Sequence, residues 1–121
     1  HYLKSLGLVI GNKIDQQIDI PKWIKRHKSY CVACLRGLMD TDGSVFVHRY
    51  RVKGKEYAYK KISFCTASDP LRRSVYRILK DLGIKPRISG RDVRIDSKEN
   101  VAKYFHLVGT HNEKHLKKWQ N

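Results

Sequence analysis

Acidic residues are scarce in this sequence, which has 11 Asp and Glu against 26 Lys and Arg among 121 residues and a formal net charge of +15. Such an excess of one sign repels itself within a folded chain unless a polyanion lies nearby. Nucleic acid is therefore the expected partner. A membrane surface would also attract the charge, but the sequence has no long apolar run and no strongly amphipathic basic helix. We therefore expect no membrane association.

Cysteine is also scarce and odd in number, at positions 31, 34 and 65. Cys31 and Cys34 have C-x-x-C spacing, but no second pair completes a four-ligand zinc site. They lie one turn apart in an apolar stretch with helical spacing, which indicates small core or interface residues in a reducing compartment. No secretory signal peptide is visible. We therefore expect an intracellular protein, cytoplasmic or organellar.

The length of 121 residues suits one domain with a modest core. We divide the chain into an N-terminal arm, residues 1–28, and a main domain, residues 29–121. Pro21 suits the first turn of a short helix over residues 21–26, from which Trp23 and Ile24 are expected to pack inward. The basic residues of 22–28 either contact phosphates or form a solvated face.

The main domain begins with a predicted helix over residues 30–39, for which Ser29 is a good N-cap. Ala33 and Gly37 lie four residues apart on one face that has almost no side chain, so another backbone can approach closely. The acid-rich run that follows is expected to end the helix, with Gly43 at a positive φ.

After this helix, the sequence pattern predicts two hairpins and three further helices. Alternation predicts strands over residues 44–51 and 57–66, joined by a turn at 53–55, and a second hairpin over residues 87–96. Asp69 is the predicted cap of a helix with Pro70 at its first position. Ser97 caps the next helix, and the last begins at residues 110–115. These elements predict an α+β domain whose antiparallel sheet has helices on one face.

The other face of this sheet carries basic, hydroxyl and aromatic side chains with few acids. Two-stranded ribbons fit the major groove of DNA, where such side chains read base edges. The predicted DNA-binding residues of this face are Phe46, His48, Tyr50, Tyr59, Lys61, Ser63, Arg87, Ser89 and Arg94. Residues expected to hold phosphates are Arg51, Lys53, Lys55 and Lys60.

The segment 35–43 resembles the nine-residue signature of the LAGLIDADG homing endonucleases. The residues that match are Leu35, Gly37, Leu38, Asp40, Asp42 and Gly43, whereas Arg36, Met39 and Thr41 differ. The resemblance covers about residues 29–118, with the family's order of helix, hairpin, helix, hairpin and helix. It implies the family's α-β-β-α-β-β-α fold with a saddle-shaped antiparallel sheet.

The resemblance also implies a metal site. In the family, two signature helices pack together at small residues, and each delivers one acid to a shared site. That acid is Asp42 here, with the main-chain oxygen of Thr41 as a second ligand for Mg²⁺ or Mn²⁺. Asp40 becomes a turn and capping acid, and Ala33 with Gly37 lies at the seam between the two helices.

Two further catalytic residues follow from the same resemblance. The family's Gly-x-x-Asn-x-Lys pattern matches Gly109, Asn112 and Lys114. Lys114 is the basic residue expected near the attacking water, with His115 as second choice. Ser68, with Thr66 close by, is the polar residue expected from the end of the second strand, where the family often has glutamine.

These features predict a site-specific DNA endonuclease of the homing type. One acid per chain is too few for two-metal hydrolysis, so the hypothesis requires a homodimer or a second signature domain. A homodimer predicts a roughly palindromic target. One alternative is a cleavage-inactive binder with the same fold, such as an RNA maturase or a transcription regulator. Another is a structural domain of an intein whose activity has decayed.

Overall fold

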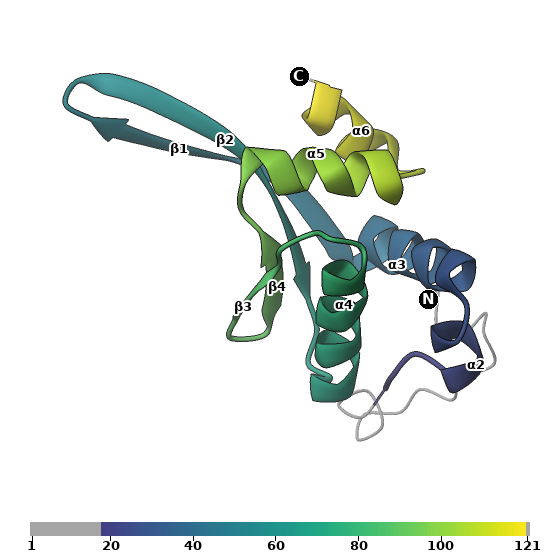
Figure 1. Ribbon diagram of the computed structural model, residues 1–121. Helices are drawn as coiled ribbons and strands as arrows, with labels where there is room; N and C mark the ends of the chain where they lie inside the picture. The colour runs from purple at the N-terminus through teal and green to yellow at the C-terminus, as the bar shows by residue number, and fades with distance from the viewer. Residues whose placement is uncertain (1–17, 121) are drawn as a thin grey trace.

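The computed structural model describes residues 18–120, so most of the predicted N-terminal arm lies outside the described residues. Its elements follow the predicted α+β order, with a four-stranded antiparallel sheet (Figure 1). In chain order they are α2 (Lys22–Lys25), α3 (Lys28–Asp42), β1 (Gly43–Val52), β2 (Lys55–Cys65), α4 (Asp69–Asp81), β3 (Arg87–Ser89), β4 (Asp92–Ile95), α5 (Lys98–Leu107) and α6 (Glu113–Gln120).

The sheet has the order β1-β2-β4-β3, and neighbouring strands are antiparallel. β1 and β2 pair over ten residues, from Gly43 opposite Phe64 to Val52 opposite Lys55. The predicted turn between them is confirmed: Lys53 and Gly54 have φ of 51° and 82°. Two consecutive positive φ values match the right-handed twist of a tight hairpin.

The core lies on the face of the sheet that the helices cover. Ile62 and Phe64 of β2 are buried there, as predicted, together with Val93 and Ile95 of β4. The helices cover only the inner part of the long hairpin, which projects beyond α5 (Figure 1). For this reason Val47, which points to the same side as the core, is 40% exposed.

Two predicted helix caps are wrong. α3 begins at Lys28 with His27 as its N-cap, because Cys31 N donates to His27 O at 2.9 Å, and Ser29 therefore lies inside the helix. α4 is capped by Ser68 rather than Asp69. Ser68 has extended backbone geometry, and its hydroxyl accepts a hydrogen bond from Leu71 N at 3.3 Å. In both cases the predicted cap lies one or two residues after the residue that caps the helix.

The short helix near the end of the arm is confirmed as α2, with Pro21 directly before it. Ile24 is buried as expected, but the prediction for Trp23 is wrong, because its side chain is 54% exposed. The Trp23 ring instead lies edge-on to Tyr30 at the surface, with 6.0 Å between centroids. Four residues of helix present too narrow a face to bury two adjacent large side chains.

The three thiols are free, with Cys31 and Cys34 buried and Cys65 exposed. Cys31 Sγ donates to Ile24 O at 3.3 Å and so joins α3 to α2. In the described part of the chain, no helix has the length and apolar character needed to cross a membrane.

Candidate functional site

The signature segment runs from α3 directly into β1, with no loop between them. α3 continues through Asp42, so the predicted helix end before that residue is wrong. Gly43 follows at once with φ −91° and ψ 171°, which is extended backbone and not the positive φ expected. It pairs with Phe64 as the first residue of β1. Asp42 is therefore placed where helix and sheet meet.

Gly43 is needed at this junction because the backbone of α3 comes very close. A Cβ built on Gly43 lies 2.6 Å from Met39 O and 3.0 Å from Met39 Cα. Both neighbours are backbone atoms, which a side-chain rotation does not relieve. The glycine of the signature thus allows a direct turn from helix to strand, without any unusual dihedral angle.

We expect Gly43→Ala to destabilise the domain by about 1–3 kcal/mol, the usual cost of forcing extra atoms into a packed site. Urea unfolding measures the loss. Gly90→Ala is the control, because a Cβ there meets open space although its φ of 60° adds strain. An equal or smaller loss for Gly43→Ala than for Gly90→Ala would show that the close approach is not what requires glycine.

Asp42 is exposed at the surface, yet its surroundings remove enough water to raise the pKa of its carboxyl. It also lies at the C-terminal end of α3, where the helix dipole disfavours negative charge. Both effects raise the free energy of the charged carboxylate, and a nearby cation offsets them. A hard divalent ion therefore suits this position.

Asp40 does not act as the turn acid expected from the resemblance, because α3 continues past it. Its carboxylate accepts hydrogen bonds from Thr110 Oγ1 and from His111 N, the latter at 2.9 Å. Its carbonyl accepts one from Asn112 Nδ2 at 2.9 Å. Asp40 therefore fastens the loop between α5 and α6 to the end of the signature helix.

This loop in turn sets the position of α6. Asn112 Oδ1 accepts hydrogen bonds from Lys114 N at 2.9 Å and His115 N at 3.4 Å, and so caps the helix. His115 is buried and hydrogen-bonds the backbone of Gly43, whereas the side chain of Lys114 is exposed. Of the two basic residues considered, the structure brings His115 into contact with the junction.

Burial lowers the pKa of His115, although Asp40 and the hydrogen bond to Gly43 act in the opposite direction. The folded protein therefore holds the neutral imidazole more strongly than the unfolded chain, whose His titrates near pH 6.5. The stabilisation that comes from the neutral His115 imidazole is complete above pH 6.5. It is lost as the pH falls through the pKa of His115 in the folded protein, which is the lower of the two.

We expect the stability difference between wild type and His115→Gln to shrink when urea unfolding is moved from pH 7.5 to 5.5. The exposed His111→Gln is the matched control, because it removes a histidine that lies at the surface. If the difference for His115→Gln grew at low pH, the charged imidazole would be the stabilising form, contrary to the buried geometry.

The structure does not bring Ser68 to the surface of the junction. Ser68 is fully buried at the N-cap of α4, and its hydroxyl donates to the carbonyl of Ile18. β2 ends at Cys65, one residue past the partner of Gly43. Cys65 is exposed, and a hydrogen bond with Asp92 raises the pKa of its thiol. The alternation of β2 predicts that Cys65 faces outward, and its exposure agrees.

Metal ligands from one copy of the chain are few. Within residues 18–120, no three His, Cys, Asp or Glu side chains gather in a way that suits a metal ion. Asp42 is therefore half of a site at most, and a metal there needs oxygen ligands from a second domain, from substrate or from water.

One face of α3 carries small side chains that are exposed to solvent. Leu35 and Leu38 are buried in the core, whereas Ala33 is exposed and Gly37 is partly exposed. Ser29 and Thr41, four residues to either side, are also exposed. The predicted seam residues thus lie on the solvent side of the helix that carries Asp42.

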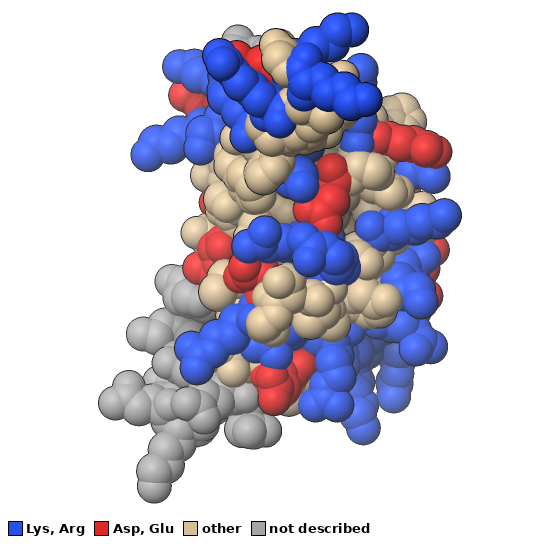
Figure 2. Space-filling model, turned by 90° about the vertical axis from the view of Figure 1, so that its left-hand side faces the viewer, with Lys and Arg blue, Asp and Glu red and all other residues tan. Residues whose placement is uncertain are grey.

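The sheet face away from the helices carries the predicted DNA-binding side chains. Strand register puts each of them there, through facing pairs such as Phe46 with Lys61 and Ser63 with Arg94. Arg51 lies on the opposite face, across from Glu56. Tyr57, which sequence reasoning did not include, faces Tyr50 on the predicted DNA-binding face. Figure 2, viewed from the hairpin side, shows Lys and Arg widely spread, with Asp and Glu in smaller patches.

Asp92 of β4 and Asp96, directly after it, hold the basic groups of this face in place. Asp96 accepts from Arg87 Nε at 2.7 Å and lies 3.5 Å from Lys61 Nζ. Asp92 pairs with Arg94 at 3.0 Å. Arg87 and Arg94, in turn, lower the pKa of Asp96 and Asp92 respectively. The inner part of the face is therefore a fixed array of cations and counter-charges.

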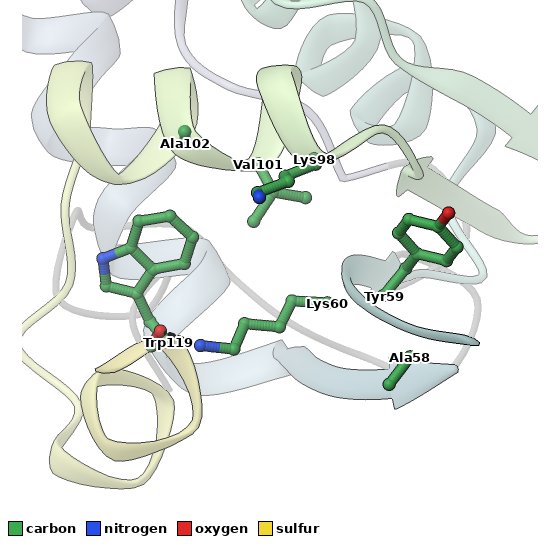
Figure 3. A pocket seen from close by; sticks show the side chains of 7 residues that line it. All are labelled: Ala58, Tyr59, Lys60, Lys98, Val101, Ala102 and Trp119. Atoms are coloured by element: carbon green, nitrogen blue, oxygen red, sulfur yellow. Dashed lines mark hydrogen bonds between the residues drawn. The ribbon is translucent and has the colours of Figure 1, made fainter. Parts of the chain in front are cut away.

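A pocket of about 400 Å³ lies between β2, α5 and α6 (Figure 3). Lys60 spans it toward α6, where its Nζ donates to the carbonyl of Trp119 and lies 5.4 Å from the Trp119 ring. Lys60, which was expected to contact phosphate, points to the helix side of the sheet. The lining has no carboxylate; its residues are Ala58, Tyr59, Lys60, Lys98, Val101, Ala102 and Trp119. Lys60 links the hairpin to α6 across this pocket. The lining lacks the carboxylates that metal-dependent hydrolysis needs.

Comparison with known families gives one match, to the model described as a LAGLIDADG-like domain, over residues 29–117. No curated protein sequence matches the chain. Domains of this family generally bind DNA and dimerise or pair, and the family includes nucleases as well as inactive maturases. The match covers nearly all of the signature helix, both hairpins, α4, α5 and the first part of α6. The chain therefore belongs to the LAGLIDADG-like domain family.

Proposed function

We propose that this protein is a site-specific DNA endonuclease of the homing type, which hydrolyses double-stranded DNA as a pair of signature domains. The observation that carries the proposal is the placement of Asp42. It ends the helix whose small-residue face is exposed, and it directly precedes β1, a strand whose outer face carries predicted DNA-binding side chains. Pairing two copies through that face brings two such carboxylates together.

The donor set at the junction fits half of a divalent-metal site. Asp42 offers a carboxylate, and the carbonyl of Thr41 is among the last four of α3, which lack partners within a helix. Both are hard oxygen ligands of the kind that Mg²⁺ and Mn²⁺ prefer. Bound metal would neutralise charge on the phosphate and the leaving oxygen.

The other residues near the junction hold its backbone in position. His115 fixes the backbone at Gly43, and Asp40 fixes the loop that leads to α6. Lys114, exposed at the start of α6, is proposed as the basic side chain near the reacting phosphate. Ser68 keeps its capping role in this proposal, because its hydroxyl is buried and already engaged.

The test is cleavage of a randomised duplex library with Mg²⁺, with EDTA as the control, followed by sequencing of the new ends. Recovery of one enriched cut site supports the proposal. A protein that enriches a bound sequence from the same library but makes no cut in Mg²⁺ or Mn²⁺ is a binder of the maturase or regulator type.

The mass in solution tests the pairing. A homodimer should appear in sedimentation experiments with the selected duplex, and its target should be roughly palindromic. A single copy on an asymmetric site would instead favour a second signature domain as the partner.

A further inference from the structure

Four aromatic rings form a continuous surface on the outer part of the hairpin. Tyr50 faces Tyr57, and His48 faces Tyr59, on the face away from the helices. The ring of Tyr50 lies 5.4 Å from that of Tyr57, 5.8 Å from Tyr59 and 5.6 Å from His48. The tyrosine planes differ by only 21° and 23°. We call these four residues the aromatic platform.

The aromatic platform is exposed, although it is large and apolar. Its three tyrosines are 37–39% exposed, and the helices lie on the other side of the sheet. Tyr50 and Tyr59 hydrogen-bond each other through their side chains, which leaves the ring faces and edges as the main contact surface. Cross-strand ring pairs stabilise a hairpin, but they do not explain why this stretch projects so far beyond the core.

The two halves of the sheet face differ in chemistry. The inner half carries Arg87, Arg94 and Lys61, held by Asp92 and Asp96. The platform carries no Lys or Arg. Basic residues surround it instead, on the other face of the hairpin and at its turn: Arg49, Arg51, Lys53 and Lys55. The two lysines at the turn are thus placed to contact phosphates while the rings meet the groove, whereas Arg49 pairs with Glu56 on the opposite face.

The chemical groups on the base edges limit which bases the aromatic platform can recognise. In the major groove, thymine alone carries a C5-methyl group, which apolar side chains contact. Adenine is usually read by Asn or Gln, and guanine by Arg or Lys. The four strands contain no Asn or Gln. An A·T pair beneath the hairpin is therefore readable mainly from its thymine.

We propose, resting on the proposed function, that the aromatic platform recognises thymine methyl groups in the outer part of each half-site. The five to seven residues between Gly43 and the platform span about 17–23 Å at roughly 3.3 Å per residue. At about 3.4 Å per base pair this places the thymines roughly five to seven pairs from the Asp42 junction. Arg87 and Arg94 of the inner half then lie over positions nearer the cut.

The test uses the duplex selected from the randomised library and replaces thymine with deoxyuridine, which removes only the methyl group. In the outer segment, each replacement should weaken binding about fourfold, the value expected for one buried methyl group. The same replacement at inner positions is the control and should change binding less than twofold. Tyr59→Ser should reduce the outer effect, with circular dichroism confirming the fold.

The outcomes separate this inference from the function on which it rests. Equal affinity for thymine and uridine duplexes, or a selected site without thymine in its outer segment, overturns the platform's role while DNA binding stands. Failure to bind any duplex overturns the proposed function and the platform's role together. Because the base is changed rather than the protein, the result holds even if Tyr59→Ser misfolds.

Discussion

Asp42→Asn is expected to reduce cleavage by about 10³-fold or more, while DNA affinity changes by less than threefold. The substitution keeps the side chain's size but removes the charge that a divalent ion requires, and losing one such electrostatic group typically costs this much in rate. Single-turnover cleavage of the selected duplex measures the rate, and fluorescence anisotropy measures binding.

The fold should not suffer from this change. Asp42 carries negative charge at a helix C-terminus, and burial raises the pKa of its carboxyl, so the neutral amide should be at least as stable. Asp81→Asn, at an exposed pair with Arg77 on α4, is the matched control and should cleave like the wild type. If Asp42→Asn lost binding and cleavage together, Asp42 would be structural, and the proposed catalytic role would be wrong.

Ala33→Glu is expected to abolish pairing and to reduce cleavage to background. Ala33 is exposed on the uncovered face of α3, one turn from Gly37. In a tight helix pair the new carboxylate would be buried against another backbone without a partner, at a cost of several kcal/mol. Sedimentation of the DNA complex should show a single copy, and the monomer should keep its thermal stability.

The control for this prediction places the same charge elsewhere. Ala102→Glu on α5 adds a carboxylate to a partly exposed alanine away from α3, and it should leave pairing and cleavage intact. Normal pairing by Ala33→Glu would contradict the use of this face and would require another route to a second acid. Loss of function by both variants would indicate a general charge effect.

Sequence patterns were sufficient for the elements and for the faces of the sheet. Val45, Ile62 and Phe64 alternate with polar residues, and this period of two fixes which side chains face the helices. The turn at Lys53 and Gly54 set the pairing register of the long hairpin. For this reason the residues predicted to bind DNA share one face of the sheet, as expected, and Tyr57 on the same face was omitted.

Local patterns were insufficient to fix the first residue of a helix and the role of a glycine at its end. Ser29 and Asp69 are good caps by type, yet His27 and Ser68 occupy the cap positions. Gly43 looked like a helix terminator at positive φ, but its lack of a side chain serves a close backbone approach instead. These outcomes depend on how the chain enters and leaves each helix, which composition does not encode.

From the sequence alone came the large positive charge, the order of elements, and the signature residues through which the chain resembles the LAGLIDADG homing endonucleases. Tertiary structure alone decided which groups meet at the junction of α3 and β1. Asp40 meets His111 and Asn112 across 71 and 72 positions of the chain, and His115 reaches Gly43 only because that loop is held. Periodicity assigns a residue to a face, but only packing between distant segments determines which residues meet there.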